Sequence, residues 1–189
     1  DWSKLQEGLT AYFYPAGGGP FSGYAKETYE NGQVKKLVQF KNGKEDGPAT
    51  YWNENGQKAS EVNYKDGEPD GLWTEWNKDG TERFRHTFKD GKEDGLSTGW
   101  YENGQKEYER TYKDGKQDGL STGWYESGQK KRELNWKNDK VMSAEVWKPN
   151  GEKCPVTNLK DGNGVGVGYK EDGTEWYRIT YKDGEQVED

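Results

Sequence analysis

The sequence predicts an all-β fold, an elongated array of antiparallel β-hairpins in a single sheet, with about seven units of 22–24 residues. Three observations predict it: glycines recur every 24 residues, tight-turn dipeptides recur within each unit, and aromatic residues alternate with polar ones between the turns. One glycine series contains Gly32, Gly56, Gly80, Gly104 and Gly128. A fixed period of this length is typical of repeat arrays, in which each unit packs on its neighbours.

Each unit is predicted to be one hairpin joined to the next by a second turn. In the unit that begins at Gly95, segments 96–101 and 106–112 are the expected strands. Asn103-Gly104 separates them and Asp114-Gly115 follows, and such pairs accept the positive backbone angles of a tight turn. A helical alternative would need apolar residues at a spacing of about 3.6, and each glycine would cost a helix about 1 kcal/mol.

Two aromatic ladders follow from the alternation, because residues two apart on a strand share a face. Leu96, Thr98 and Trp100 on one first strand recur 24 residues later on the next. The second strands carry Phe40, Tyr64, Phe88, Tyr112, Trp136 and Tyr181 at equivalent places. We therefore expect one aromatic face and one polar face.

The repeats divide the chain into a single array with two short ends. Residues 1–20 are apolar outside the period and are expected to cap the array, which spans 21–184, and 185–189 form a C-terminal tail. The unit near 137–158 is irregular, since Asn138-Asp139 replaces the usual turn pair and two prolines interrupt it. A bend is expected there.

The composition restricts the partners and the compartment. Only 28% of residues are apolar and 33% are charged, but 9 Trp, 13 Tyr and 5 Phe supply the area that a fold can bury. A net charge of -7 argues against nucleic acid as a partner, and no apolar stretch is long enough for a transmembrane segment.

The chain starts at Asp1 without an initiator methionine, so either a signal segment was removed or the chain was trimmed. Export or the cell envelope is the expected compartment, with the cytoplasm as the alternative.

The titratable residues point away from catalysis. His86 occupies a strand position that other units fill with Val or Arg, and the single cysteine, Cys154, has no histidine near it in sequence. We expect no enzyme activity, no cofactor and no metal. Asp residues repeat beside the turns at 46, 70, 94 and 118. We interpret them as turn residues, and calcium binding is the alternative.

Two segments carry a resemblance to a known family. They are TGWYENGQKEYERTYKDGKQDG at 98–119 and TEWNKDGTERFRHTFKDGKEDG at 74–95. Both resemble MORN-type repeats, in the bacterial variant found in YwqK-family antitoxin proteins, and the resemblance covers about residues 21–184. It implies a β-hairpin repeat fold and a role in protein assembly, with membrane lipid association in some eukaryotic members.

The predicted function is a non-enzymatic scaffold or antitoxin-like module that binds another protein along its aromatic face, because exposed Trp and Tyr residues anchor interfaces. The predicted partner-binding residues are Trp52, Trp73, Trp76, Trp100, Trp124, Tyr64 and Tyr112. The alternative is a glycan- or cell-wall-binding module, since Gly-Trp-Tyr at 99–101 and 123–125 resembles the repeats of choline- and glucan-binding proteins.

Overall fold

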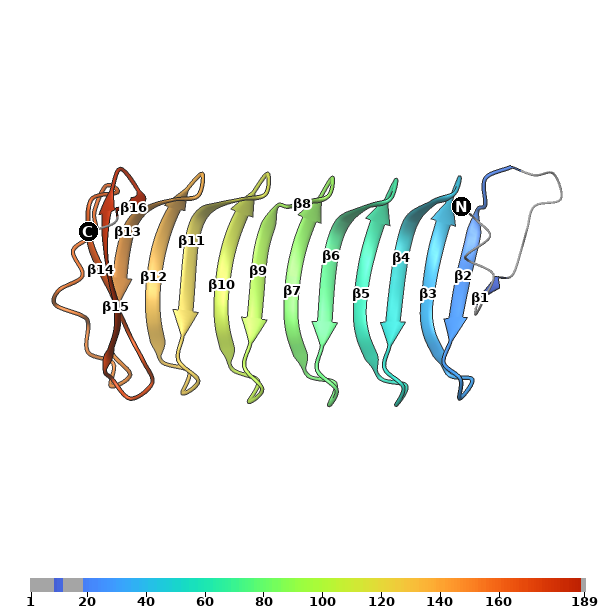
Figure 1. Ribbon diagram of the computed structural model, residues 1–189, viewed down its shortest axis with the longest axis horizontal. Helices are drawn as coiled ribbons and strands as arrows, with labels where there is room; N and C mark the ends of the chain where they lie inside the picture. The colour runs from blue at the N-terminus through green and yellow to red at the C-terminus, as the bar shows by residue number, and fades with distance from the viewer. Residues whose placement is uncertain (1–8, 12–18, 188–189) are drawn as a thin grey trace. The chain divides into compact units, whose positions relative to one another are not determined.

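The computed structural model of the protein describes residues 9–11 and 19–187, which form strands and turns and contain no helix. They belong to two compact units that divide between Lys92 and Glu93, and the two-residue strand β8 (Lys92–Glu93) spans this division. Each unit is a succession of antiparallel hairpins (Figure 1). The all-β hairpin fold that the sequence predicts is therefore confirmed. Most of the cap predicted at 1–20 lies outside the described residues.

Unit 1 is an antiparallel meander in which every strand pairs with the next one in the chain. Its strands are β1 (Leu9–Ala11), β2 (Gly23–Thr28), β3 (Val34–Lys41), β4 (Lys44–Trp52), β5 (Lys58–Lys65), β6 (Glu68–Trp76) and β7 (Glu82–Lys89). Their bounds follow the predicted turns, because the Asn-Gly and Asp-Gly pairs end one strand and begin the next.

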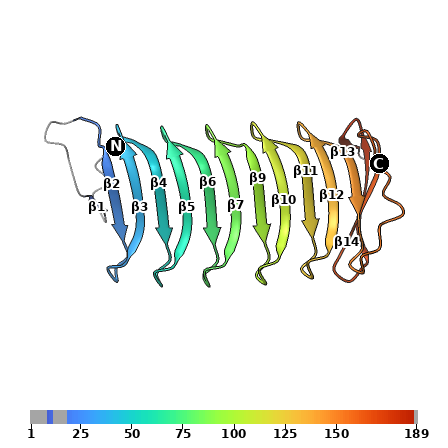
Figure 2. The same cartoon turned by 180° about the vertical axis from the view of Figure 1, so that it is seen from behind.

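Unit 2 continues the same pattern and then changes to a second sheet. The meander strands are β9 (Gly95–Trp100), β10 (Lys106–Lys113), β11 (Lys116–Trp124), β12 (Lys130–Lys137) and β13 (Lys140–Val146). The second sheet contains β14 (Gly164–Tyr169), β15 (Glu175–Lys182) and β16 (Glu185–Val187), which are labelled in Figure 1; Figure 2 shows β14 from behind. The sequence predicted a single sheet and a tail after residue 184, whereas residues 185–187 form a strand that pairs with β15.

The left-handed turn positions are occupied by the residues that tolerate them. Asp66 and Asp90 have φ of 53° and 47°, and each precedes a glycine whose φ is also positive. The backbone amide of the glycine then donates a hydrogen bond to the previous hairpin. The Gly67 N–H, for example, donates to the Glu45 carbonyl at 2.8 Å. The Asp-Gly pairs thus close one hairpin and join it to its neighbour.

The repeated aspartates accept hydrogen bonds that join successive turns. The carboxylate of Asp94 accepts a hydrogen bond from the backbone N–H of Asp114 at 3.0 Å, twenty residues further on. The same bond joins Asp46 to the Asp66 amide, Asp70 to the Asp90 amide and Asp118 to the Asn138 amide. These contacts support the interpretation of the aspartates as turn residues.

Removing one such acceptor is expected to weaken the fold modestly. Asp94→Ala should lower the free energy of unfolding by about 1 kcal/mol, because the Asp114 amide loses its acceptor, and Asp94→Asn should retain most of the stability. Urea denaturation checks this, repeated with calcium and with a chelator. A wild-type midpoint that falls in the chelator would contradict the turn interpretation and favour calcium.

The core of unit 1 is a row of small and β-branched residues between aromatic rings. Val38, Ala49 and Val62 face one another across β3, β4 and β5, and each is at most 2% exposed. Phe40, Tyr51, Tyr64 and Trp73 pack against them. In a single-layered sheet the rings of neighbouring strands cover the row between them, which explains how aliphatic residues become buried.

The core of unit 2 forms where the second sheet meets β13. Val146, Cys154, Val167 and Tyr169 make one buried cluster. The irregular segment after β13 runs beside that strand, since the Cys154 N–H donates to the Val146 carbonyl at 2.7 Å and the Ala144 N–H donates to the Leu159 carbonyl at 3.3 Å. This segment corresponds to the irregular unit that the sequence predicts near 137–158.

Candidate functional site

The register places two chemically different faces on the sheet of each unit. We call one the threonine face; its central row contains Thr50, Glu61 and Thr74 in unit 1, and Thr98, Glu109, Thr122 and Glu133 in unit 2. We call the opposite one the core face; its central row contains Ala49, Val62 and Trp73 in unit 1, and Ser97, Arg110, Ser121 and Leu134 in unit 2.

The predicted partner-binding residues divide between these faces. The threonine face carries Trp52, Trp76, Trp100 and Trp124, and the core face carries Tyr64, Trp73 and Tyr112. Trp52 shares a face with Thr50 on β4, whereas Tyr64 shares a face with the buried Val62 on β5. The expectation of one aromatic and one polar face is therefore wrong, because the two ladders lie on opposite sides of the sheet.

The core-face rings of unit 1 are engaged in packing. Tyr64 and Trp73 pack against the buried valines, and the Trp73 indole N–H donates to the Ser60 hydroxyl at 3.0 Å. The Trp73 ring also lies 5.6 Å from the Phe88 ring. These side chains hold the sheet together, so their structural role accounts for their aromatic character.

The threonine face repeats a group of Lys, Glu and Trp side chains. Lys106 forms an ion pair with Glu109, and its ammonium nitrogen lies 5.7 Å from the centre of the Trp124 ring. The same group recurs as Lys58, Glu61 and Trp76, and as Lys130, Glu133 and Trp147. Each lysine thus pairs with a carboxylate and covers an indole on the next strand or, for Trp147, directly after it. The rings are half-buried and have paired charges at their edges.

Exposed leucines lie on the same face at equivalent repeat positions. Leu72, Leu96 and Leu120 are 45%, 49% and 46% exposed, and each lies two residues before a buried threonine. The sequence shows that these leucines recur, but recurrence alone does not tell an exposed position from a core position. Large apolar side chains exposed at a regular interval are typical of interaction surfaces.

The tyrosines of the Gly-Trp-Tyr motifs are structural. Tyr125 is 0% exposed, and its hydroxyl donates to the Trp147 carbonyl at 2.8 Å; Tyr101 makes the same bond to the Trp124 carbonyl. Burial raises the pKa of Tyr101 and of Tyr125 to about 12 in each case, so both hydroxyls remain protonated donors at neutral pH. Tyr125 is therefore unavailable for sugar stacking, whereas Tyr101 is half-buried like the tryptophans of the two motifs.

The two candidates for catalysis occupy packed environments. The His86 ring lies between Phe84 and Phe88 in unit 1, at 6.0 and 6.2 Å between ring centres. In unit 2, Cys154 is 4% exposed and its sulfur lies 3.1 Å from the Tyr169 hydroxyl. Burial raises the pKa of the Cys154 thiol, but hydrogen bonds from Thr157 and Tyr169 outweigh it and the net shift is downward.

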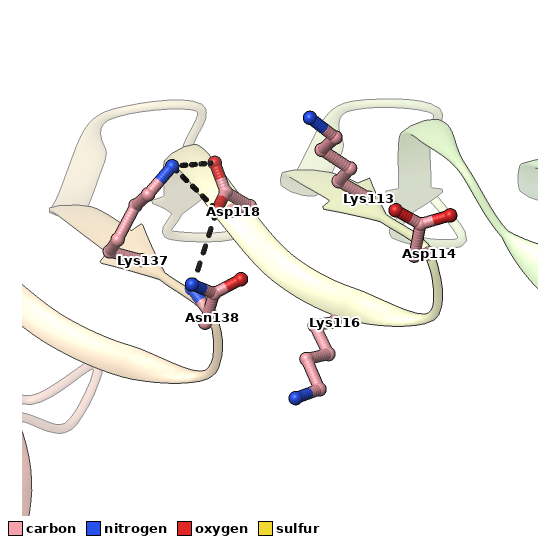
Figure 3. Close-up of a pocket in the computed structure, with 6 residues that line it drawn as sticks. All are labelled: Lys113, Asp114, Lys116, Asp118, Lys137 and Asn138. Carbon is pink, nitrogen blue, oxygen red and sulfur yellow. Dashed lines mark hydrogen bonds and ion pairs between the residues drawn. The ribbon is translucent and has the colours of Figure 1, made fainter.

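The turn aspartates do not gather into a metal centre. Figure 3 shows the hollow at two successive turns of unit 2, where Lys137 and Asn138 point toward Asp118. The Lys137 ammonium lies 3.0 Å from a carboxylate oxygen of Asp118, and this hydrogen bond lowers the pKa of that carboxyl group. Within residues 9–11 and 19–187, no group of three His, Cys, Asp or Glu side chains could hold a metal ion.

The comparisons with known proteins agree with the repeat geometry. The family model described as a MORN repeat variant matches residues 22–42, 45–66, 93–114 and 117–138. Each matched segment corresponds to one hairpin, with two complete or nearly complete strands and the tight turn between them. No curated protein matches the chain. In the described part of the chain, no helix is long and apolar enough to cross a membrane. Over these four segments the chain is therefore similar to MORN-type repeats.

Proposed function

We propose that the protein is a non-enzymatic binding module that docks another protein on the threonine face. The observation that carries this proposal is the recurrence of exposed leucines beside half-buried tryptophans, with Leu96 and Trp100 on β9 and Leu120 and Trp124 on β11. Trp is the residue type most often found at the energetic centre of protein interfaces, and surrounding apolar contacts exclude water from it.

Charge pairing on this face favours a protein partner over a glycan. The Lys106 and Lys130 ammonium groups lie over the rings of Trp124 and Trp147, at 5.7 and 5.1 Å, where a sugar ring would have to stack. Ion pairs at the edge of a patch are typical of the polar rim of a protein interface. Glycan binding is therefore the second candidate, and an antitoxin-like role is one form that the protein-binding function could take.

The test introduces a charge at the exposed leucines of unit 2. The purified full chain and the double variant Leu96→Lys, Leu120→Lys should both fold, because the replaced side chains are largely exposed. Mild affinity purification from the native host should recover a stoichiometric protein with the wild type, and the double variant should reduce its recovery by about ten-fold or more.

A matched control tests whether the loss of binding is specific to the threonine face or follows from replacing any exposed apolar side chain. Val156 is 41% exposed on the irregular segment of unit 2, so Val156→Lys makes the same change away from the threonine face. Recovery should be unchanged in this variant. Recovery of envelope polysaccharide without a protein would indicate that the tryptophans bind a glycan. If the double variant and Val156→Lys recovered the same amount of partner protein, the threonine face would not be the binding surface.

A further inference from the structure

A cavity of about 360 Å³ lies in unit 2 between the core face of β10–β13 and the second sheet. Its polar lining includes Arg110, Gln117, Ser121 and Arg132 from the meander, and Tyr177 and Tyr181 from β15. The rest of the lining is mostly apolar, with Trp136, Leu134 and Ile179 among the larger side chains. Cavities of this size and character are typical of sites for small molecules.

The cavity concentrates positive charge in an acidic protein. The whole chain has 35 acidic and 28 basic residues, yet the lining contains two arginines and no Asp or Glu. Neither Arg110 nor Arg132 forms an ion pair with a carboxylate of the described residues. Guanidinium groups gathered in a partly buried hollow without a counter-charge attract an anion.

Both arginines are held in position by their neighbours. The Arg110 guanidinium carbon lies 4.3 Å from the centre of the Tyr108 ring, on which it stacks. The Arg132 stem crosses Gly123, where an added Cβ would lie 3.2 Å from the arginine Cγ. Glycine at 123 therefore leaves room for the Arg132 side chain to lie along the sheet. A guanidinium group that is already held in position loses less conformational entropy when it binds a carboxylate.

The apolar side of the cavity holds an unpaired donor. The Trp136 indole N–H is buried, and no acceptor for it lies among the residues that the structure describes. Opposite the meander, the Tyr181 ring approaches Gly166, where an added Cβ would lie 3.4 Å away. Buried donors without an acceptor are rare in folded proteins, and each one calls for an explanation, such as a bound water or a ligand.

We propose that this cavity binds a small organic anion, a carboxylate carried on an aromatic or apolar body. The arginines at 110 and 132 bind the carboxylate, because a guanidinium group donates parallel hydrogen bonds to its two oxygens. The rings of Trp136, Tyr177 and Tyr181 contact the apolar body. The site lies on the core face, so it is distinct from the protein-binding surface on the threonine face.

The test compares two ligands with the same ring system, one with a carboxylate and the other with a neutral alcohol. Calorimetry of the full chain should detect saturable binding of 1-naphthoate, with one molecule per chain, and 1-naphthalenemethanol should bind about ten-fold more weakly or less. Binding should also shift the Trp136 indole N–H resonance, which is identified with Trp136→Phe. Equal binding of the alcohol, or no saturable binding of 1-naphthoate at millimolar concentrations, would overturn the proposal.

Variants locate the anion within the cavity. Arg132→Met and Arg110→Met should each weaken 1-naphthoate binding about ten-fold, and Arg132→Lys should retain part of the affinity. Arg178→Met is the matched control, because Arg178 pairs with Glu175 outside the lining. Wild-type affinity in both cavity variants would overturn the site. If either variant fails to fold by circular dichroism, the Trp136 resonance of the wild type decides the question.

Discussion

Replacing Tyr125 by alanine is expected to lower the free energy of unfolding by about 3–5 kcal/mol, the cost typical of removing a fully buried aromatic side chain. Tyr125 is the largest fully buried residue among those that the structure describes. The cost has two parts, since the ring is fully buried in unit 2 and the hydroxyl donates a hydrogen bond to the Trp147 carbonyl. Urea denaturation followed by tryptophan fluorescence measures the sum.

Tyr125→Phe separates the two parts. This variant keeps the ring and removes the hydrogen bond, so it should cost about 1 kcal/mol. Tyr24→Ala is the surface control: Tyr24 is 51% exposed, and its loss should cost less than about 1 kcal/mol. If Tyr125→Ala were no more destabilising than Tyr24→Ala, the burial of Tyr125 described above would be wrong.

Gly162→Ala is expected to destabilise unit 2 by about 2–4 kcal/mol, because it combines backbone strain with a steric clash. Gly162 is buried with φ of 78°, and an added Cβ would lie 2.7 Å from the Gly184 backbone nitrogen. That nitrogen cannot rotate away as a side chain could, since its N–H donates to the Gly162 carbonyl at 2.8 Å. Gly162 also donates to the Met142 carbonyl of β13.

Gly173→Ala is the matched control for this prediction. Gly173 has φ of 82°, nearly the same backbone angle, but no atom lies within 4 Å of its added Cβ. It should therefore cost only the strain of the left-handed conformation, about 1 kcal/mol. Urea midpoints of both variants give the comparison. Equal costs would show that the close approach of residues 162 and 184 does not constrain the fold.

The placement of binding residues explains why a repeat protein needs so many aromatic side chains. On the core face, Tyr64 and Trp73 cover the valine row of unit 1. On the threonine face, Trp100 and Trp124 are half-buried beside exposed leucines. One residue class thus serves stability on one side and, in our proposal, recognition on the other, since a thin sheet has no second layer to cover both faces.

Much of the fold follows from the sequence alone. The Asp-Gly and Asn-Gly pairs determine where strands end, because few other residues accept the left-handed turn positions seen at Asp66 and Gly67. The 24-residue period makes every hairpin equivalent to the next, so the all-β array and the turn role of the aspartates could be predicted. The shared face of Leu96, Thr98 and Trp100 also follows from simple alternation.

The tertiary structure alone decided which faces the ladders occupy and where the second sheet begins. Alternation relates residues within one strand, but the pairing of Ala49 with Val62 sets the relation between strands, and a shift by one residue would reverse it. The cavity between Arg132 and Tyr181 depends on the packing of β15 against the meander. Such contacts join residues far apart in sequence, and no local propensity encodes them.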